Sequence, residues 1–121
     1  MDYIAGVESR GFIIGAALAA RMKKGMVLIR KSGKLPFKTV GVEYTLEYGS
    51  GFLEMHSDAL DKGQSVVLAD DLLATGGTSR AAAKLVEKVG GRVAAYVFLL
   101  ELEGLHGRKR LGEDVITLIK C

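Results

Sequence analysis

Five short apolar runs constrain the fold of this chain more than any other feature. They are rich in Val, Ile, Leu and Ala and lack the polar alternation typical of a sheet with one wet face. Strands buried on both faces belong to parallel sheets covered by helices, so we expect an α/β fold with a mainly parallel five-stranded sheet. The predicted strands are Tyr3 to Val7, Met26 to Arg30, Ser65 to Asp70, Val93 to Leu100 and Val115 to Ile119.

Two segments between these runs are predicted to form the helices that flank the sheet. The segment from Gly11 to Met22 has apolar residues at fourfold spacing and carries no charge before Arg21. The segment from Thr78 to Val89 has an apolar stripe opposed by charged residues, and Gly90 and Gly91 end it. Both patterns indicate helices that pack one face on the sheet.

The segment between Lys31 and Gly63 departs from this pattern. Lys38 to His56 carries Thr, Val, Tyr and Phe with interspersed glycines, which favours extended ribbons and a mobile loop as an insertion in the fold. Gly104 to Leu111 is predicted to be a short helix or turn. With 121 residues, 49% of them hydrophobic, we expect one domain over residues 1–121.

Charge and cysteine content narrow the class of partner. The net charge is only +3 and no basic cluster stands out, so we expect a phosphorylated small molecule and no nucleic acid. The single cysteine, Cys121, cannot pair within the chain and gives no sign of an oxidising compartment, so we expect the cytoplasm. No apolar stretch approaches the length of a membrane span, so we expect no membrane partner.

The segment from Val66 to Thr78, VVLADDLLATGGT, combines a strand, two acids, a loop rich in Gly and Thr, and a helix start. Ligands in open α/β sheets bind beyond the carboxyl ends of strands, which places Asp70 and Asp71 at the rim of a site. Adjacent carboxylates accept hydrogen bonds from vicinal hydroxyls such as those of ribose, and their charge favours Mg²⁺ nearby. The alternative is that these acids merely cap a strand; the continuous order of the parts favours the site.

The loop that follows is predicted to bind a terminal monophosphate. Backbone N–H groups at a helix N-terminus attract an anion, and glycines let a phosphate approach closely. The residues of this loop are Ala74, Thr75, Gly76, Gly77 and Thr78.

Two further groups of residues follow predicted strands. Ser9 and Arg10 join the first strand to a helix, where a hydroxyl, N–H groups and a guanidinium suit a pyrophosphate. Arg30, Lys31 and Lys34 follow the second strand and repel one another unless a polyanion or water screens them. Surface cations in contact with water are the alternative in both cases, but the position at strand ends favours pyrophosphate binding.

Four segments together resemble the type I phosphoribosyltransferases. The segment from Val66 to Thr78 resembles their signature for 5-phosphoribosyl 1-pyrophosphate, and ADDLLATGGT within it resembles the adenine-specific members. GVESRGFIIG (Gly6 to Gly15) resembles their pyrophosphate turn, IRKSGKLP (Ile29 to Pro36) their basic loop, and TLEYG (Thr45 to Gly49) their flexible catalytic loop. The resemblance extends from Tyr3 to Lys120.

The resemblance implies a reaction in purine salvage. Adenine and 5-phosphoribosyl 1-pyrophosphate would give AMP and pyrophosphate, with Mg²⁺ as cofactor held mainly by substrate oxygens near Asp70 and Asp71 rather than directly by the protein. Arg10, Arg30 and Lys34 would stabilise the leaving group together with Mg²⁺. The resemblance also implies a homodimer.

The resemblance implies roles for residues that contact the base. Glu47 would close over the site and handle the purine proton, with Tyr48 beside it binding substrate; an exposed strand acid is the alternative for Glu47. Leu72 and Leu102 would contact the flat purine, although leucines are core residues by default. Tyr44 is a weaker candidate.

The resemblance also implies that the Glu8–Ser9 peptide is cis. His56 and His106 lie outside any metal-ligand pattern, so no role is assigned to them and no zinc site is expected.

The resembled enzymes have a further N-terminal segment, a hood over one side of the base. Here Met1 and Asp2 lead directly into the first predicted strand, so we expect the hood to be absent. Two alternatives to an active enzyme therefore stay open: a regulator that binds 5-phosphoribosyl 1-pyrophosphate without catalysis, and an inactive fragment. Glu47 and the basic loop argue against the regulator, as does the absence of a DNA-binding segment.

Overall fold

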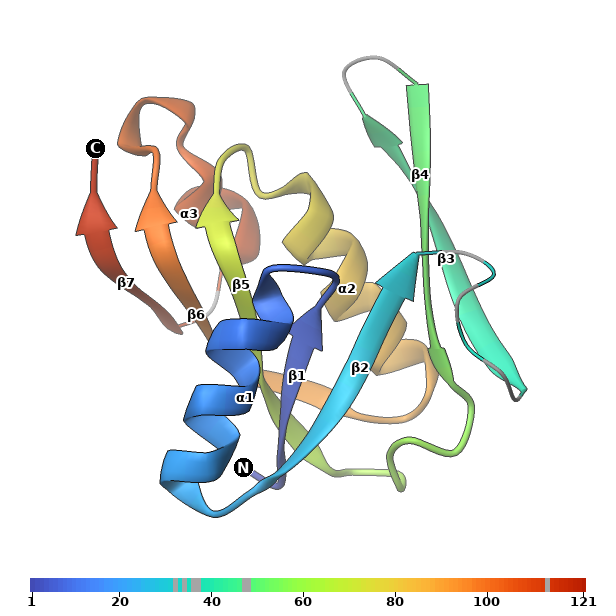
Figure 1. The fold of residues 1–121 in the computed structure, drawn as a ribbon. Helices are drawn as coiled ribbons and strands as arrows, with labels where there is room; N and C mark the ends of the chain where they lie inside the picture. Colours follow the sequence, from blue (N-terminus) through green and yellow to red (C-terminus); the bar gives the residue numbers. More distant parts are fainter. Residues whose placement is uncertain (32, 34, 36–37, 47–48, 113) are drawn as a thin grey trace.

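The computed structural model describes residues 1–31, 33, 35, 38–46, 49–112 and 114–121. One sheet with helices on both faces makes up the fold (Figure 1). The strands are β1 (Tyr3–Val7), β2 (Gly25–Lys31), β3 (Thr39–Leu46), β4 (Gly49–His56), β5 (Ser65–Leu73), β6 (Arg92–Glu101) and β7 (Asp114–Lys120). The helices are α1 (Gly11–Met22), α2 (Gly77–Lys88) and α3 (Gly107–Leu111), with a 3-10 turn, η1 (Glu103–Leu105), before α3.

The predicted parallel strands form the centre and one side of the sheet. The strand order is β3-β4-β2-β1-β5-β6-β7, and every neighbouring pair from β2 to β7 is parallel. The parallel order confirms the prediction, because these strands are the five apolar runs. Their carboxyl ends therefore meet at one edge of the sheet, where ligands bind in such folds.

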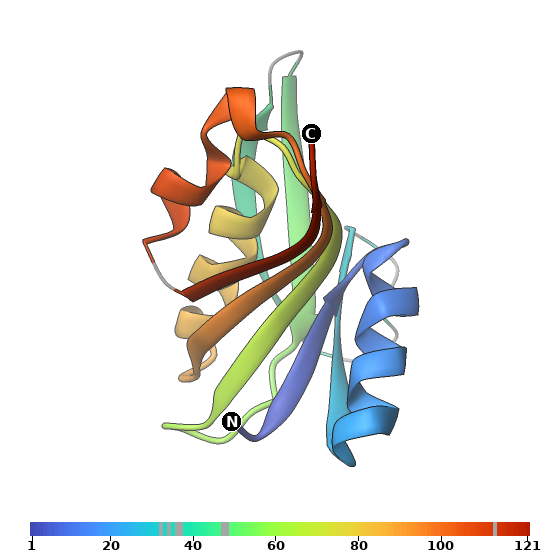
Figure 2. The same ribbon diagram turned by 90° about the vertical axis from the view of Figure 1, so that its left-hand side faces the viewer.

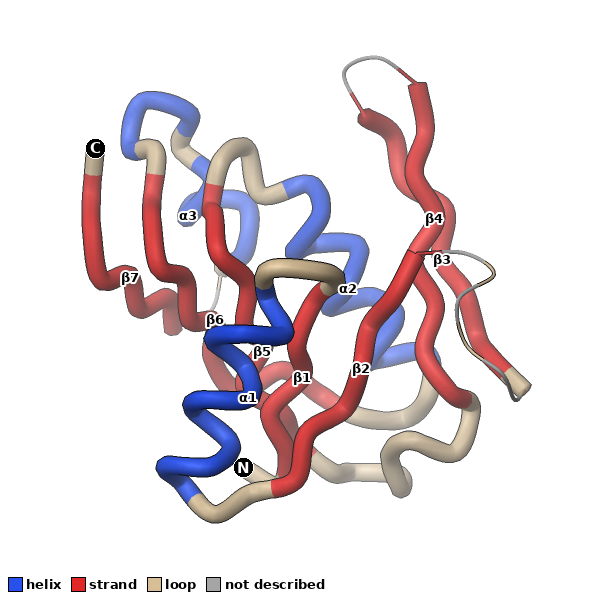
Figure 3. Tube along the Cα trace, viewed as in Figure 1, coloured by secondary structure: helices blue, strands red, loops and turns tan. Residues whose placement is uncertain are grey.

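The predicted number of strands is wrong: within the described residues the sheet has seven strands. The insertion contributes the other two, because β3 and β4 form an antiparallel hairpin that pairs with the end of β2 through Arg30 opposite Glu54 and Lys31 opposite Leu53. Figure 3 shows this hairpin beyond the edge of β2. Pairing satisfies backbone groups of β2 that an edge strand would leave to water.

The helices cover the two faces unequally. Figure 2 shows α1 on one face and α2 with α3 on the other. The prediction for α1 is confirmed, α2 begins one residue earlier than predicted, and the predicted short helix is the 3-10 turn followed by α3. None of the helices in the described ranges is long and apolar enough to cross a membrane.

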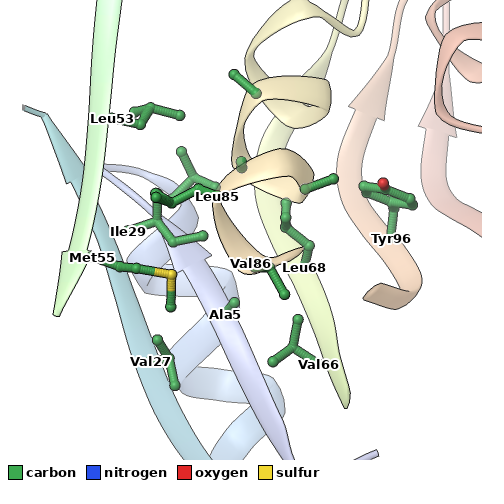
Figure 4. Packing of buried hydrophobic residues seen from close by; sticks show 14 of the residues in the cluster. Ala5, Val27, Ile29, Leu53, Met55, Val66, Leu68, Leu85, Val86 and Tyr96 are labelled. Atoms are coloured by element: carbon green, nitrogen blue, oxygen red, sulfur yellow. The ribbon is translucent and has the colours of Figure 1, made fainter. Parts of the chain in front are cut away.

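The main core lies between α2 and the sheet. Leu85 and Val86 of α2 face Ile29, Met55 and Leu68 from three strands, and all five side chains are buried (Figure 4). Burying such a side chain contributes roughly 1.5–3 kcal/mol. A smaller cluster under α1 contains Ile4, Ala19 and Ala69. Together these clusters fix α1 and α2 relative to the carboxyl ends of the strands, where the candidate site lies.

Candidate active site

A cleft of about 890 Å³ opens at the carboxyl ends of β1 and β5, beside the β3–β4 hairpin. Its volume suits a nucleotide-sized ligand. The residues that line it are Val7, Glu8, Ser9, Arg10, Lys31, Tyr44, residues 50–53 and residues 70–79. Residues predicted from three separate segments, the acid pair, the pyrophosphate turn and the phosphate loop, therefore lie around one cavity.

Asp70 and Asp71 differ sharply in their surroundings, although they are adjacent. Asp70 is 9% exposed, and its Oδ1 accepts a hydrogen bond from the Asp71 backbone N–H at 2.8 Å. Gly11 permits this burial, because a Cβ there would lie 2.8 Å from the Ala69 carbonyl oxygen and 3.1 Å from Asp70 Oδ1. The Asp71 carboxylate is half-buried, and its Oδ2 lies 2.8 Å from Arg10 Nε.

Burial dominates the titration of Asp70. It raises the pKa of Asp70 to about 7 from 3.8, and the neighbouring Asp71 carboxylate adds to the rise. The Asp71 backbone N–H and the Arg10 guanidinium oppose it. Asp70 thus exchanges a proton near neutral pH at the rim of the cleft, a property common in functional sites.

The phosphate loop, residues 74–78, joins β5 to α2. Gly76 caps the helix with a φ of +88°, a left-handed conformation that glycine adopts without penalty. In the described part of the chain no side chain caps the first turn of α2, and that turn contains no acidic residue. Its N–H groups therefore remain available to an anion, and all five loop residues line the cleft.

The pyrophosphate turn reaches the acid pair through Arg10, which pairs with Asp71. Its Glu8–Ser9 peptide bond is cis, as the resemblance implied. Ser9 and Arg10 line the cleft, and the Arg10 side chain is 75% exposed despite its contact with Asp71. A ligand in the cleft would find this guanidinium held in place by Asp71.

The structure separates the basic residues that follow β2. Lys31 lines the cleft, whereas Arg30 does not. Arg30 Nε lies 3.1 Å from Glu8 Oε1, and its guanidinium carbon lies 5.8 Å from the centre of the Phe12 ring. Glu8 also accepts the Lys31 backbone N–H at 3.0 Å, and this bond, followed by Arg30, lowers the pKa of Glu8. The pairing of Arg30 with Glu8 was not anticipated, because the two residues are far apart in sequence.

Leu72 and Leu102 have different positions relative to the cleft. Leu72 lines it, whereas Leu102 does not; the Leu102 N–H donates to the Leu73 carbonyl oxygen at 2.9 Å. Lys34, Glu47 and Tyr48 lie outside the described residues, so their roles stay predictions.

Sequence reasoning missed several residues that line the cleft, and it ranked Tyr44 low. Glu8 was placed in the pyrophosphate turn without a role of its own. The missed residues are Val7, Ser50, Gly51, Phe52, Leu53, Leu73 and Ser79. Those of the hairpin could have been found only if β4 had been recognised as a strand that folds back beside the phosphate loop.

The donor groups fit a magnesium ion that is held mainly by its substrate. No three His, Cys, Asp or Glu side chains converge as a metal-binding cluster in the described portion of the chain. Mg²⁺ commonly binds through one or two carboxylates together with substrate phosphates and water. Asp70 and Asp71, which line a cleft beside the phosphate loop, match that arrangement.

Comparison with known proteins places this site in a family. The sequence model of the phosphoribosyl transferase domain matches residues 1–121. An adenine phosphoribosyltransferase from Caldicellulosiruptor saccharolyticus is 58% identical over 98% of this chain and 69% of its own length. The chain belongs to the adenine phosphoribosyltransferase family. This membership confirms the resemblance of the four motifs.

Solved structures of the family agree with the fold. The adenine phosphoribosyltransferase of Thermoanaerobacter pseudethanolicus is 57% identical, with a TM-score of 0.96 over 99% of this chain and 70% of that chain. The Saccharomyces cerevisiae enzyme, solved with adenine and an imino-altritol bisphosphate, is 43% identical, with a TM-score of 0.93 over 98% of this chain and 67% of that chain. The Trypanosoma brucei enzyme, solved with AMP, pyrophosphate and ribose-5-phosphate, is 32% identical, with a TM-score of 0.89 over 99% and 56% respectively.

Proposed function

We propose that this protein transfers the 5-phosphoribosyl group from 5-phosphoribosyl 1-pyrophosphate to adenine, giving AMP and pyrophosphate in purine salvage. The observation that carries the proposal is that the acid pair and the phosphate loop line the same cleft. Family membership supports the choice of adenine as the base. Complexes of relatives with adenine, or with AMP, pyrophosphate and ribose-5-phosphate, support the substrates and products.

The phosphate loop anchors the 5-phosphate of the ribose. Its N–H groups lie at the N-terminus of α2, where the helix dipole favours negative charge, and Thr75 and Thr78 add hydroxyl donors. Asp70 and Asp71 then lie beside the ribose and accept hydrogen bonds from its hydroxyls. The phosphate and the ribose ring are thus fixed by neighbouring residues of one strand–loop–helix unit.

Catalysis rests mainly on positioning and charge. The anomeric carbon gains positive charge as pyrophosphate departs, and the acid pair beside the ribose stabilises that charge. Arg10 and Lys31, which line the cleft, stabilise the departing pyrophosphate. Lys34 of the basic loop assists them, whereas Arg30 acts from outside the cleft, where it pairs with Glu8 of the pyrophosphate turn. Asp70 and Asp71 would hold Mg²⁺ beside the substrate, where the ion would supply positive charge that stabilises the leaving group.

The base is handled by Glu47, Tyr48 and two leucines. Glu47 moves the proton of the purine as the new bond forms, and Tyr48, its neighbour in the sequence, binds substrate. Leu72 contacts the flat face of the base from the cleft wall. Leu102, which follows β6, also contacts the base.

The active form is a cytoplasmic homodimer. Ile13 of α1 is 75% exposed, and Met22 and Leu28 are also exposed large apolar residues. Large apolar side chains exposed to water, Ile13 above all, support association of two copies, and the exposed Cys121 thiol is compatible with a reducing compartment.

The proposal is tested by incubating the chain with Mg²⁺, 5-phosphoribosyl 1-pyrophosphate and labelled adenine, guanine or hypoxanthine in parallel. We expect nucleotide from adenine alone. Tight binding of 5-phosphoribosyl 1-pyrophosphate without nucleotide formation would instead identify a regulator, provided that Glu47→Ala binds the ligand equally tightly. Nucleotide from another base at equal rate would overturn the assignment of adenine.

Sedimentation of the chain and of Ile13→Asp tests the dimer: the dimer should dissociate in the variant.

A further inference from the structure

A partly buried ion pair between Glu101 and Arg108 links the last two strands to α3. Arg108 Nη2 donates to Glu101 Oε1 at 2.7 Å, and its Nη1 donates to the Val115 carbonyl oxygen at 2.6 Å. Glu101 is 5% exposed and also accepts the Thr117 hydroxyl at 2.9 Å. Arg108 therefore joins β6, the start of β7 and its own helix through one planar group.

The same helix forms the back wall of the phosphate loop. Gly107, which precedes Arg108, packs its backbone against the loop: a Cβ on Gly107 would collide with the Ala74 carbonyl oxygen and lie 3.1 Å from Gly76 N. A Cβ on Gly76 would lie 2.9 Å from the Gly107 carbonyl oxygen. The two backbones thus touch without intervening side chains, so a displacement of α3 must displace the loop.

We propose that Arg108, held by Glu101, is a positioning residue that fixes the conformation of the phosphate loop by holding α3 against it. A helix of five residues is not stable by itself, so its place depends on tertiary contacts. The ion pair supplies such contacts to β6 and β7. Arg108 does not line the cleft, so it acts on the ligand only through the loop.

This role predicts a selective defect. The loop binds the ribose 5-phosphate end of the substrate, whereas Arg10 and Lys31 bind pyrophosphate on another wall of the cleft. Weakening the ion pair should therefore reduce affinity for ribose 5-phosphate and leave affinity for pyrophosphate unchanged. The ligand readout rests on the proposed function; the conformation of the loop can be measured without it.

The test compares Arg108→Gln with Lys109→Gln, which removes the same charge from an exposed neighbour on α3. Amide hydrogen exchange of residues 74–78 and calorimetric titration with ribose 5-phosphate and with pyrophosphate are measured on each. We expect Arg108→Gln to speed exchange in the loop and to weaken ribose 5-phosphate binding roughly tenfold, which corresponds to about 1.4 kcal/mol. Lys109→Gln should match the wild type, and Arg108→Lys should recover part of the affinity.

Unchanged loop exchange in Arg108→Gln would overturn the inference, as would equal losses of affinity for the two ligands. If the wild-type chain binds no ribose 5-phosphate, the proposed function fails while loop exchange still decides the positioning role. If Arg108→Gln does not fold, Thr117→Val removes one bond to Glu101 and should speed loop exchange to a smaller degree; no change there would also overturn the inference.

Discussion

Replacing Asp70 by Asn should make the protein more stable at alkaline pH while it impairs the site. The substitution removes the charge and keeps an oxygen that can accept the Asp71 N–H, which donates to Asp70 Oδ1 at 2.8 Å. Because the carboxyl group is 9% exposed, its ionised form loses most of its contact with water in the folded state. The Asn side chain bears no such cost.

The size of the effect follows from the pKa of Asp70, which burial raises from 3.8 to about 7. Between these values the folded protein holds a proton that the unfolded chain releases, so stability falls as pH rises from about 4 to about 7. At about 1.4 kcal/mol per pH unit, the loss amounts to roughly 4 kcal/mol in the wild type. Asp70→Asn abolishes this loss, which is large beside a typical stability of about 5–15 kcal/mol.

Urea unfolding followed by circular dichroism at about pH 4.5 and about pH 8 measures the effect. The quantity of interest is the free energy of unfolding of Asp70→Asn minus that of the wild type. We expect this difference to be roughly 3 kcal/mol larger at the higher pH than at the lower pH. Asp58→Asn, the same change at an exposed aspartate, supplies the background. If the free energies of unfolding of Asp70→Asn and wild type differ by the same amount at both pH values, the reasoning is refuted.

Three further predictions concern the loop, the base and the ion pair. Gly76→Ala should cost about 2–3 kcal/mol in thermal unfolding and weaken phosphate binding, because φ is +88° and the new Cβ would lie 2.9 Å from the Gly107 carbonyl oxygen of α3. Gly112→Ala, at φ +68° in open space, should cost only about 1 kcal/mol. Equal costs of the two substitutions would contradict the contact between the loop and α3. Glu47→Ala should lower turnover roughly 100-fold and leave binding of 5-phosphoribosyl 1-pyrophosphate intact in steady-state and titration assays; unchanged turnover would contradict its role. Glu101→Gln should lose about 1 kcal/mol at neutral pH, because Arg108 is 40% exposed and water screens the pair. Since Arg108 lowers the pKa of Glu101, this stabilisation exists above pH 4.5 and disappears as pH falls further, so the wild-type and variant unfolding curves should converge in acid; a constant gap would contradict it.

The parts of the fold that the sequence predicted depend on local pattern. The central strands read as apolar runs because both of their faces are covered, and the glycines of the phosphate loop mark the one place where the chain must turn tightly into α2. The hairpin was expected only as extended ribbons, because nothing local to β4 shows that it pairs with β2.

The parts of the site that were not predicted depend on contacts between distant segments. The burial of Asp70 arises from Gly11, which brings the start of α1 against β5. The pairing of Arg30 with Glu8 arises because β1 and β2 are parallel neighbours, with Val7 opposite Ile29. Residue types and motif spacing identify the groups that bind an anion, whereas these pairings set the charge each group carries and the direction it faces.

The central claim is that Asp70, Asp71 and the phosphate loop bind the ribose 5-phosphate part of the substrate. Calorimetric titration with 5-phosphoribosyl 1-pyrophosphate and Mg²⁺, comparing wild type with the double variant Asp70→Asn, Asp71→Asn, tests it most directly. The dissociation constant should rise about tenfold or more in the double variant while its circular dichroism spectrum stays native. An unchanged dissociation constant in a folded double variant would contradict the claim.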